Sequence, residues 1–107
     1  MDDTALPALD EDGYLRDLAD WSPDVAARLA REEAVVLEAP QWEVLELVRA
    51  FHDRHALVPD NRALVKLVRT NLGPEKGRSV YLMRLFGGRP ALTVARIAGL
   101  PRPTNCL

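Results

Sequence analysis

The sequence predicts a mainly α-helical fold, a compact bundle of about five helices with a small N-terminal β-hairpin and an extended, flexible C-terminal arm. Apolar residues recur at helical spacing through the middle of the chain, capping residues and Gly or Pro breaks separate these stretches, and two prolines stiffen the end. With 107 residues the chain has the usual length of one domain. We expect a single domain over 1–107, with the hairpin at about 5–18, the helical body at about 22–99 and the arm at 100–107.

The hairpin is predicted from one cluster of turn-forming residues. Asp10-Glu11-Asp12-Gly13 lies between short apolar stretches, and Tyr14 and Leu15 follow it directly. A turn cluster that ends in Gly and is flanked in this way is typical of a tight connection between two antiparallel strands.

The first two helices follow clear start signals. Ser22-Pro23-Asp24 combines a side chain that caps free N–H groups, a proline tolerated at the first helical position and an acid at the positive helix end. A short amphipathic helix should run from there to about Glu33. A second helix should begin near Pro40 and end near Leu57, before Pro59, because its apolar residues share one stripe: Leu45, Val48 and Phe51.

Three shorter helices follow. Asp60 is suited to cap a helix that Gly73-Pro74 stops, since Gly accepts the left-handed conformation at a helix end and Pro cannot continue the hydrogen-bond ladder. Apolar spacing predicts a fourth helix around 81–86. A fifth should begin at Pro90 and close at Gly99, with several alanines that allow close packing.

The arm has the sequence Leu100-Pro101-Arg102-Pro103-Thr104-Asn105-Cys106-Leu107. Its two prolines remove backbone donors and fix φ, so it is neither helical nor part of a central strand and should lie extended. From Gly99 to Cys106 such a chain reaches about 20 Å. We therefore expect Cys106 to be presented well clear of the helical body.

Cys106 is the only cysteine. A single thiol forms no internal disulfide and fits a reducing compartment. It acts as a nucleophile when it is ionised and accessible, and its pKa falls near Lys or Arg. Arg102 is close to it in sequence, and Arg84, Arg89 and Lys76 are candidates to approach it in space. A frayed end with an unused thiol is the alternative, but a useless tail needs no proline stiffening.

The charges are unevenly divided along the chain. Residues 1–61 carry 15 acidic and 5 basic residues, a net charge of −10, whereas residues 62–107 carry 1 acidic and 9 basic residues, a net charge of +8. This asymmetry favours an anionic partner for the C-terminal half, although charged faces that only keep a protein soluble give the same pattern. The residues we expect to meet such a partner are Arg62, Lys66, Lys76 and Arg78.

Other functions are less favoured by the sequence. His52 and His55 are three apart on one predicted helix, but zinc needs three or four ligands and only Cys106 is left to join them, so neither metal nor cofactor is expected. The basic helix after Asp60 keeps a DNA-binding regulator as an alternative, although nothing else marks a helix-turn-helix dimer. An acidic start and short apolar runs predict a cytoplasmic protein that does not enter a membrane.

Several stretches of the sequence together resemble one known family. They are the turn at 10–15, Trp21, Trp42-Glu43-Val44, Arg62-Ala63-Leu64-Val65-Lys66, Leu72-Gly73-Pro74-Glu75-Lys76-Gly77, Tyr81-Leu82, Leu85-Phe86 and Ile97-Ala98-Gly99-Leu100-Pro101-Arg102-Pro103-Thr104-Asn105-Cys106. These stretches resemble the TusE/DsrC family over nearly the whole chain, and the motif that ends in a penultimate cysteine is the most specific of them. That family has a small helical domain with an N-terminal hairpin and a flexible C-terminal arm, so the resemblance implies the same fold here.

The resemblance implies that Cys106 carries a persulfide, as the penultimate cysteine does in that family. Members of the DsrC branch have a second cysteine where this chain has Ala95, so the chain is more similar to the single-cysteine TusE branch. That branch takes sulfur from the TusBCD complex and passes it to the thiouridylase MnmA, which thiolates the wobble uridine of tRNA. Departures from the family pattern, which concern the partner more than the thiol, are Gly87-Gly88 after Phe86, Thr93 and Asn105.

From this resemblance we expect a sulfurtransferase of the persulfide-carrier type, with a TusBCD-like donor and an MnmA-like acceptor with its tRNA. Two alternatives stay open. One is a DsrC-like protein that uses the arm to dock or regulate partners such as dissimilatory sulfite reductase-type proteins. The other is a carrier in sulfur oxidation or sulfite reduction.

Overall fold

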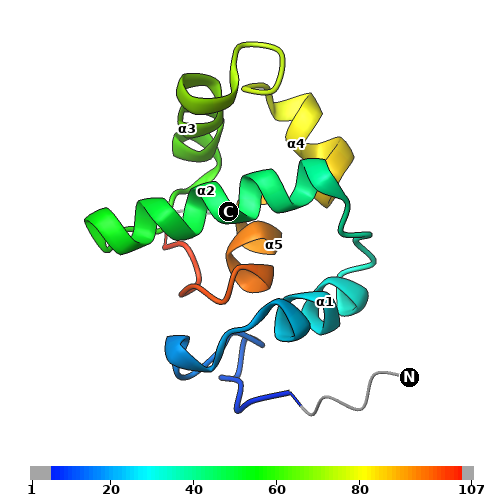
Figure 1. Cartoon of the computed structure of the whole chain (residues 1–107), viewed down its shortest axis with the longest axis vertical. Helices are drawn as coiled ribbons and strands as arrows, with labels where there is room; N and C mark the ends of the chain where they lie inside the picture. The colour runs from blue at the N-terminus through cyan, green and yellow to red at the C-terminus, as the bar shows by residue number, and fades with distance from the viewer. Residues whose placement is uncertain (1–5, 105–107) are drawn as a thin grey trace.

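The computed structural model describes residues 6–104, and within them the chain forms five α-helices and one short 3-10 helix (Figure 1). This confirms the predicted helical class and the number of helices. The 3-10 helix was not foreseen. The elements are η1 (Leu18–Asp20), α1 (Pro23–Glu32), α2 (Ala39–His55), α3 (Asn61–Leu72), α4 (Ser79–Phe86) and α5 (Pro90–Ile97).

The helices begin where side chains satisfy their first N–H groups. The Ser22 hydroxyl accepts the N–H of Val25 at 3.2 Å, and the Asp60 carboxylate accepts the N–H of Ala63 at 2.9 Å. Both caps act as the sequence predicted. At the start of α2 the Glu38 N–H donates to the side-chain oxygen of Gln41 at 3.1 Å, which fixes a start one residue before the expected Pro40.

Helix α5 lies at the centre of the molecule (Figure 1) and packs against each of the other four helices. It is only eight residues long, and its small side chains let its neighbours approach closely. The six of its residues that are buried are Pro90, Ala91, Thr93, Val94, Ala95 and Ile97.

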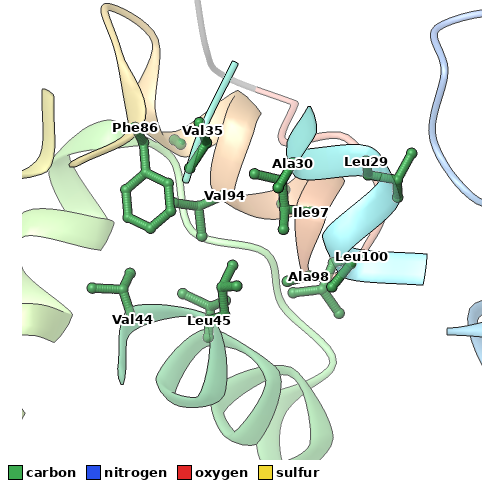
Figure 2. Packing of buried hydrophobic residues seen from close by; sticks show 14 of the residues in the cluster. Leu29, Ala30, Val35, Val44, Leu45, Phe86, Val94, Ile97, Ala98 and Leu100 are labelled. Atoms are coloured by element: carbon green, nitrogen blue, oxygen red, sulfur yellow. The ribbon is translucent and has the colours of Figure 1, made fainter. Parts of the chain in front are cut away.

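The hydrophobic core surrounds α5. Figure 2 shows apolar side chains of α1, α2 and α4 converging on it, together with Val35 from the loop between α1 and α2. Full burial of one such side chain stabilises the fold by about 1.5–3 kcal/mol. The core therefore holds the end of α5 firmly, and the arm begins at that end. The core residues labelled in Figure 2 are Leu29, Ala30, Val35, Val44, Leu45, Phe86, Val94, Ile97, Ala98 and Leu100.

The predicted N-terminal β-hairpin does not form, and residues 6–104 contain no strand. The turn itself is present, with the Gly13 N–H bonded to the Asp10 carbonyl at 3.0 Å, but only one isolated antiparallel bridge, between Leu9 and Leu15, accompanies it. The Asp10 carboxylate instead binds the N–H groups of Asp12 and Tyr14, both at 2.9 Å. Side-chain bonds to the backbone thus compete with a strand ladder here.

The arm also differs from the prediction. Residues 100–103 are neither helical nor in a strand, as expected, but Leu100 is 3% exposed and Pro103 is among the fully buried side chains. An apolar side chain gains free energy by leaving water, and this outweighs the solvated extended form that we expected. The arm therefore lies on the helical body as far as Pro103 and does not leave it at Gly99.

No helix in the described part of the chain is long and apolar enough to cross a membrane. The longest, α2, has 17 residues. A helix of that length is about 25 Å long and falls short of the about 30 Å hydrocarbon core of a bilayer.

Candidate functional site

Cys106, the predicted sulfur carrier, lies outside the described residues, as does Asn105. The structure instead describes the segment that carries it. We call residues 99–104 the arm root, because they connect the end of α5 to the thiol-bearing terminus. The geometry of the arm root determines where on the body the thiol is attached.

The arm root starts with a tight reversal at the end of α5. Gly99 has φ +72°, a left-handed conformation that other residues adopt only at a cost. Its N–H donates to the Arg96 carbonyl at 3.1 Å, and the next N–H, of Leu100, donates to the Ala95 carbonyl at 2.9 Å. These bonds close the helix as the glycine predicted and turn the chain back against the core.

Two side chains from distant parts of the sequence hold this reversal. The Trp21 indole N–H donates to the Ile97 carbonyl at 2.9 Å, and the Arg49 guanidinium donates to the Ala98 carbonyl at 2.6 Å. The guanidinium also lies over the Trp21 ring, 3.7 Å from its centroid. We call Trp21 and Arg49 the arm clamp. Burial lowers the pKa of Arg49 from its usual value, and the charge of Asp53 partly opposes this shift.

Sequence reasoning missed the arm clamp. Trp21 enters the sequence analysis only through the family resemblance, and no sequence pattern distinguishes Arg49 from the other charged residues of α2. The available signal was the glycine that closes a helix of small residues, since a tight helix end leaves carbonyl groups in need of donors. The sequence does not tell which distant side chains provide them.

Arg102 lies on the arm root and is exposed. It lines an open hollow of about 460 Å³ together with Arg89, Thr93 and Arg96. Arg96 is already paired with acids, as described below, whereas Arg89 and Arg102 make no ion pair within residues 6–104. The structure thus brings together two of the cations that we expected near the thiol.

The arm root ends beside the start of α3. Thr104 lines a small hollow of about 180 Å³ with Phe51, Leu57, Asp60 and Ala63, at the junction of α2 and α3. Leu57 is 58% exposed there. The described part of the arm therefore delivers the chain to the junction of these two helices.

The outer face of α3 forms a basic groove. We call it the α3 groove; it has a volume of about 560 Å³, and its cations Arg62 and Lys66 are exposed and unpaired within the described residues. The third cation, Arg69, donates to the Gly77 carbonyl at 2.9 Å. Among residues 6–104 no acidic residue lines the groove, so all its charged groups are positive. Its lining residues are Asn61, Arg62, Val65, Lys66, Arg69 and Ser79.

The other predicted basic residues are placed differently. Lys76 is ion-paired with Glu43 of α2 at 2.7 Å, and this hydrogen bond raises the pKa of Lys76, although burial partly opposes the shift. Arg78 directly precedes α4 and Arg84 lies on α4; both are exposed. These three residues line neither the Arg102 hollow nor the α3 groove.

Acids of the N-terminal half neutralise two cations of the basic half. Besides Lys76 with Glu43, Arg96 of α5 bonds Glu33 at 2.6 Å, Glu32 at 2.5 Å and the Gly13 carbonyl at 2.9 Å. Burial opposes the charge on Arg96, but the bonds to Glu32 and Glu33 raise its pKa above the usual value. We call these pairs and the arm clamp the inter-half seam. Part of the charge asymmetry therefore holds the fold together.

The two histidines do not form a metal site in the described part of the chain. The ring of His55, at the end of α2, packs against Phe51 with centroids 4.9 Å apart. Within residues 6–104 no group of three His, Cys, Asp or Glu side chains lies close enough to hold a metal ion.

The fold and site define a class of protein: a small helical domain whose single cysteine follows a proline-containing segment anchored on a central helix. The chain belongs to the DsrC-like family, because the family model described as "DsrC like protein" matches residues 3–107.

Curated relatives share this length and sequence. The chain is 45% identical over 98 residues to the protein named sulfurtransferase TusE of Yersinia pestis, covering 92% of this chain and 90% of the relative. It is 42% identical over 98 residues to sulfurtransferase TusE of Salmonella typhimurium, with coverage of 92% and 90%.

Solved structures of the family have the same fold. The DsrC structure from Allochromatium vinosum matches with a TM-score of 0.84 and 40% identity, covering 92% of this chain and 88% of that one. The oxidized γ-subunit of dissimilatory sulfite reductase (DsrC) from Archaeoglobus fulgidus matches with a TM-score of 0.80 and 33% identity, covering 94% and 92%. The predicted family is therefore confirmed.

Proposed function

We propose that this protein is a sulfur carrier that holds a persulfide on Cys106 and passes the outer sulfur to a partner. The observation that carries the proposal is a single thiol placed two residues beyond an arm root that is anchored on the central helix, in a chain of the DsrC-like family. Relatives named sulfurtransferase support the same chemistry.

The transfer needs only thiols and persulfides. The Cys106 thiolate attacks the outer sulfur of a donor persulfide, a new S–S bond forms, and the donor cysteine leaves as a thiolate. An acceptor thiolate then attacks the outer sulfur of the Cys106 persulfide, and Cys106 leaves as a thiolate. Each step makes one bond to the outer sulfur and breaks one, so no further oxidant or reductant is required.

The attachment point of the thiol supports a role for the neighbouring cations. A chain covers at most about 3.6 Å per residue, so Cys106 is tethered within about 7 Å of Thr104. Thr104 lies at the junction of α2 and α3, where the hollow that it lines includes Asp60 and Ala63, and these two residues flank in sequence Asn61 and Arg62, which line the α3 groove. We propose that Arg62 and Lys66 meet an anionic partner beside the thiol, and that Arg102 favours its ionised form.

Three further residues from the sequence prediction keep a smaller role in the proposal. Arg78 and Arg84 are exposed on the same basic half and extend the positive surface that a partner meets. Lys76 is already bound to Glu43, so we assign it to positioning the loop between α3 and α4.

The most specific form of the proposal is a relay in the cytoplasm for 2-thiolation of tRNA wobble uridine. A TusBCD-like complex would be the donor, and an MnmA-like enzyme with its tRNA would be the acceptor. The relatives' names and the single cysteine favour this form. Ala95, which stands where the DsrC branch has its second cysteine, is 2% exposed inside the central helix.

Mass spectrometry tests the carrier role. After incubation with a cysteine desulfurase system and cysteine, the intact protein should gain about 32 Da, the mass of one sulfur atom, and should lose it on reduction with a thiol. Cys106→Ser should gain nothing while keeping the wild-type melting temperature, because the substitution leaves every residue of the described core unchanged. A Cys106→Ser protein that still gains the sulfur refutes the proposal.

Charge reversal tests the α3 groove. Arg62→Glu with Lys66→Glu should slow sulfur transfer to or from the partner at least tenfold at low salt, since opposite charges speed encounter and like charges oppose it. The single variants Arg62→Glu and Arg54→Glu change the net charge equally, and Arg54→Glu, at an exposed position on α2 outside the α3 groove, should slow transfer far less than Arg62→Glu. Equal slowing by both variants would mean that net charge alone matters.

The alternative is a protein that docks or regulates partners through the arm without carrying sulfur, or one that serves sulfur oxidation or sulfite reduction. The observation that favours it is the structural match to a γ-subunit of dissimilatory sulfite reductase. A persulfide on Cys106 separates a carrier from a docking protein, and the partners that co-purify with the wild-type chain separate the two metabolic settings.

A further inference from the structure

The end of α5 is unusually well supplied with hydrogen-bond donors. The last carbonyls of a helix have no partner inside the helix. Here the Val94, Ala95 and Arg96 carbonyls are bound by the backbone N–H groups of residues 98–100. The two that remain, of Ile97 and Ala98, are bound by the arm clamp. Every carbonyl from Val94 to Ala98 therefore has a donor, and the last two donors come from side chains.

The two clamp residues come from separate elements and also bind each other. Trp21 lies between η1 and α1, and Arg49 lies in the middle of α2, yet the guanidinium is 3.7 Å from the centroid of the indole ring. A cation above an aromatic ring is attracted by it, and more so when both are shielded from water. The arm clamp is therefore one unit that joins three parts of the body at the start of the arm.

The arm clamp contacts Gly99, the residue at which the arm root begins. A Cβ atom on Gly99 would lie 2.3 Å from Cδ1 of Trp21, so the indole ring rests directly on the Gly99 backbone. Beyond this point Leu100 and Pro103 are buried, whereas Pro101 and Arg102 are exposed. The chain thus leaves the arm clamp with one side against the body, in a direction set by contacts that begin at Gly99.

We propose that Trp21 and Arg49 are positioning residues that fix the direction of the arm root, and through it the place at which Cys106 meets a partner. The part that concerns sulfur transfer rests on the proposed function, whereas the part that concerns arm geometry does not. Neither residue touches the reacting sulfur. They act through Gly99 and the buried residues of the arm root.

Distance measurement between spin labels tests the geometric part. In a Cys106→Ser background, labels at Thr104→Cys and Thr70→Cys report the arm root against α3, and both positions are exposed. A second pair, Asp24→Cys with Thr70→Cys, reports α1 against α3 and leaves the arm out. Trp21→Phe removes the indole N–H with the five-membered ring and keeps one aromatic ring, whereas Arg49→Met removes the charge and both contacts.

We expect each clamp variant to broaden the arm–body distance distribution at least twofold and to leave the body–body distribution unchanged. Arg54→Met, an exposed arginine on the same helix, is the matched control and should change neither. Unchanged arm–body widths in both variants overturn the proposal. Broadening of both pairs together also overturns it, because the clamp residues then only stabilise the body. Trp21→Phe keeps the test decisive if Arg49→Met folds poorly.

Kinetics test the functional part with Cys106 restored. Because misplacement of a reacting group by about 1 Å can slow a reaction about a hundredfold, we expect Arg49→Met to slow sulfur transfer to a protein partner at least tenfold. Alkylation of Cys106 by iodoacetamide needs no docking and should change less than twofold. Equal slowing of both reactions overturns the positioning role. If wild-type Cys106 carries no persulfide at all, the proposed function fails while the spin-label result still stands.

Discussion

The inter-half seam and the α3 groove contain the same kinds of cation in opposite settings. In the seam Arg96 is bound by Glu32 and Glu33, and its side chain is 13% exposed. In the α3 groove Arg62 and Lys66 are exposed and face no acid among the described residues. The +8 charge of the C-terminal half is therefore used in two ways, one to hold the halves together and one to remain available to partners. Substitutions in the seam should change the free energy of unfolding, and substitutions in the α3 groove should change the rate of association with a partner.

The largest stability loss is expected from Gly99→Ala, at the arm clamp in the seam. The added methyl group would collide with Trp21 and force a left-handed conformation on alanine. Together these effects should lower the free energy of unfolding by about 3 kcal/mol. Urea denaturation would measure it. Gly88→Ala is the control, since nothing lies within 4 Å of its Cβ position, and a similar loss in both would show that the arm clamp is irrelevant.

Arg96→Met should have the next largest effect. Methionine keeps an apolar stem but loses the bonds to Glu32, Glu33 and the Gly13 carbonyl. Because the partly buried Glu33 and the Gly13 carbonyl lose a partner that is itself 13% exposed, the free energy of unfolding should fall by about 2 kcal/mol. Arg89→Met, at an exposed neighbour in the same hollow, should cost less than about 0.5 kcal/mol. Equal losses would contradict the distinction between seam and surface.

Asp10→Asn should give a smaller effect that depends on pH. Bonds from the Tyr14 and Asp12 N–H groups, with help from Arg16, lower the pKa of Asp10 below 3.8, while burial opposes the shift. The charged form is therefore favoured in the folded state, and its contribution is present above pH 3.8 and lost as pH falls through the lowered pKa. The gap in melting temperature between wild type and variant should close below pH 3.8. A gap that persists at low pH would argue against an ionic origin.

The smallest effect on stability is expected in the α3 groove. Arg62→Gln with Lys66→Gln should change the free energy of unfolding by less than about 0.5 kcal/mol, because exposed charges without partners contribute little. The same variant should weaken the salt dependence of sulfur transfer, since fewer charges then meet the partner. A large stability loss would mean that the groove also belongs to the structural network.

Most helices could be predicted because their ends are local. Ser22 and Asp60 cap helices within three residues of themselves, and the break at Gly73-Pro74 acts on adjacent backbone. The failure of the hairpin to form could not be predicted. Asp10 favours a turn, but its side-chain oxygen also accepts the N–H groups of Asp12 and Tyr14. The residue types at 10–15 are compatible both with a hairpin and with a turn that has one isolated bridge.

The site was predicted less completely for a different reason. Cys106 and the basic half follow from composition and family resemblance, whereas the arm clamp depends on contacts across 76 and 49 positions of sequence. Helical spacing tells which face of a helix is buried, but not which distant donor reaches its last carbonyls. The burial of Pro103 was missed likewise, since proline predicts a stiff extended chain without indicating whether that chain is solvated.

The anchoring of Pro103 limits how delivery can work. Cys106 follows that anchor by three residues, a reach of about 11 Å when the chain is fully extended. A tether this short cannot carry the thiol from one catalytic centre to another within a single assembly, as a long flexible linker does. Each round of delivery then requires release from the supplier, free diffusion and a fresh encounter with the recipient. Turnover should accordingly depend on the concentration of this protein and on its rate of dissociation from each partner enzyme.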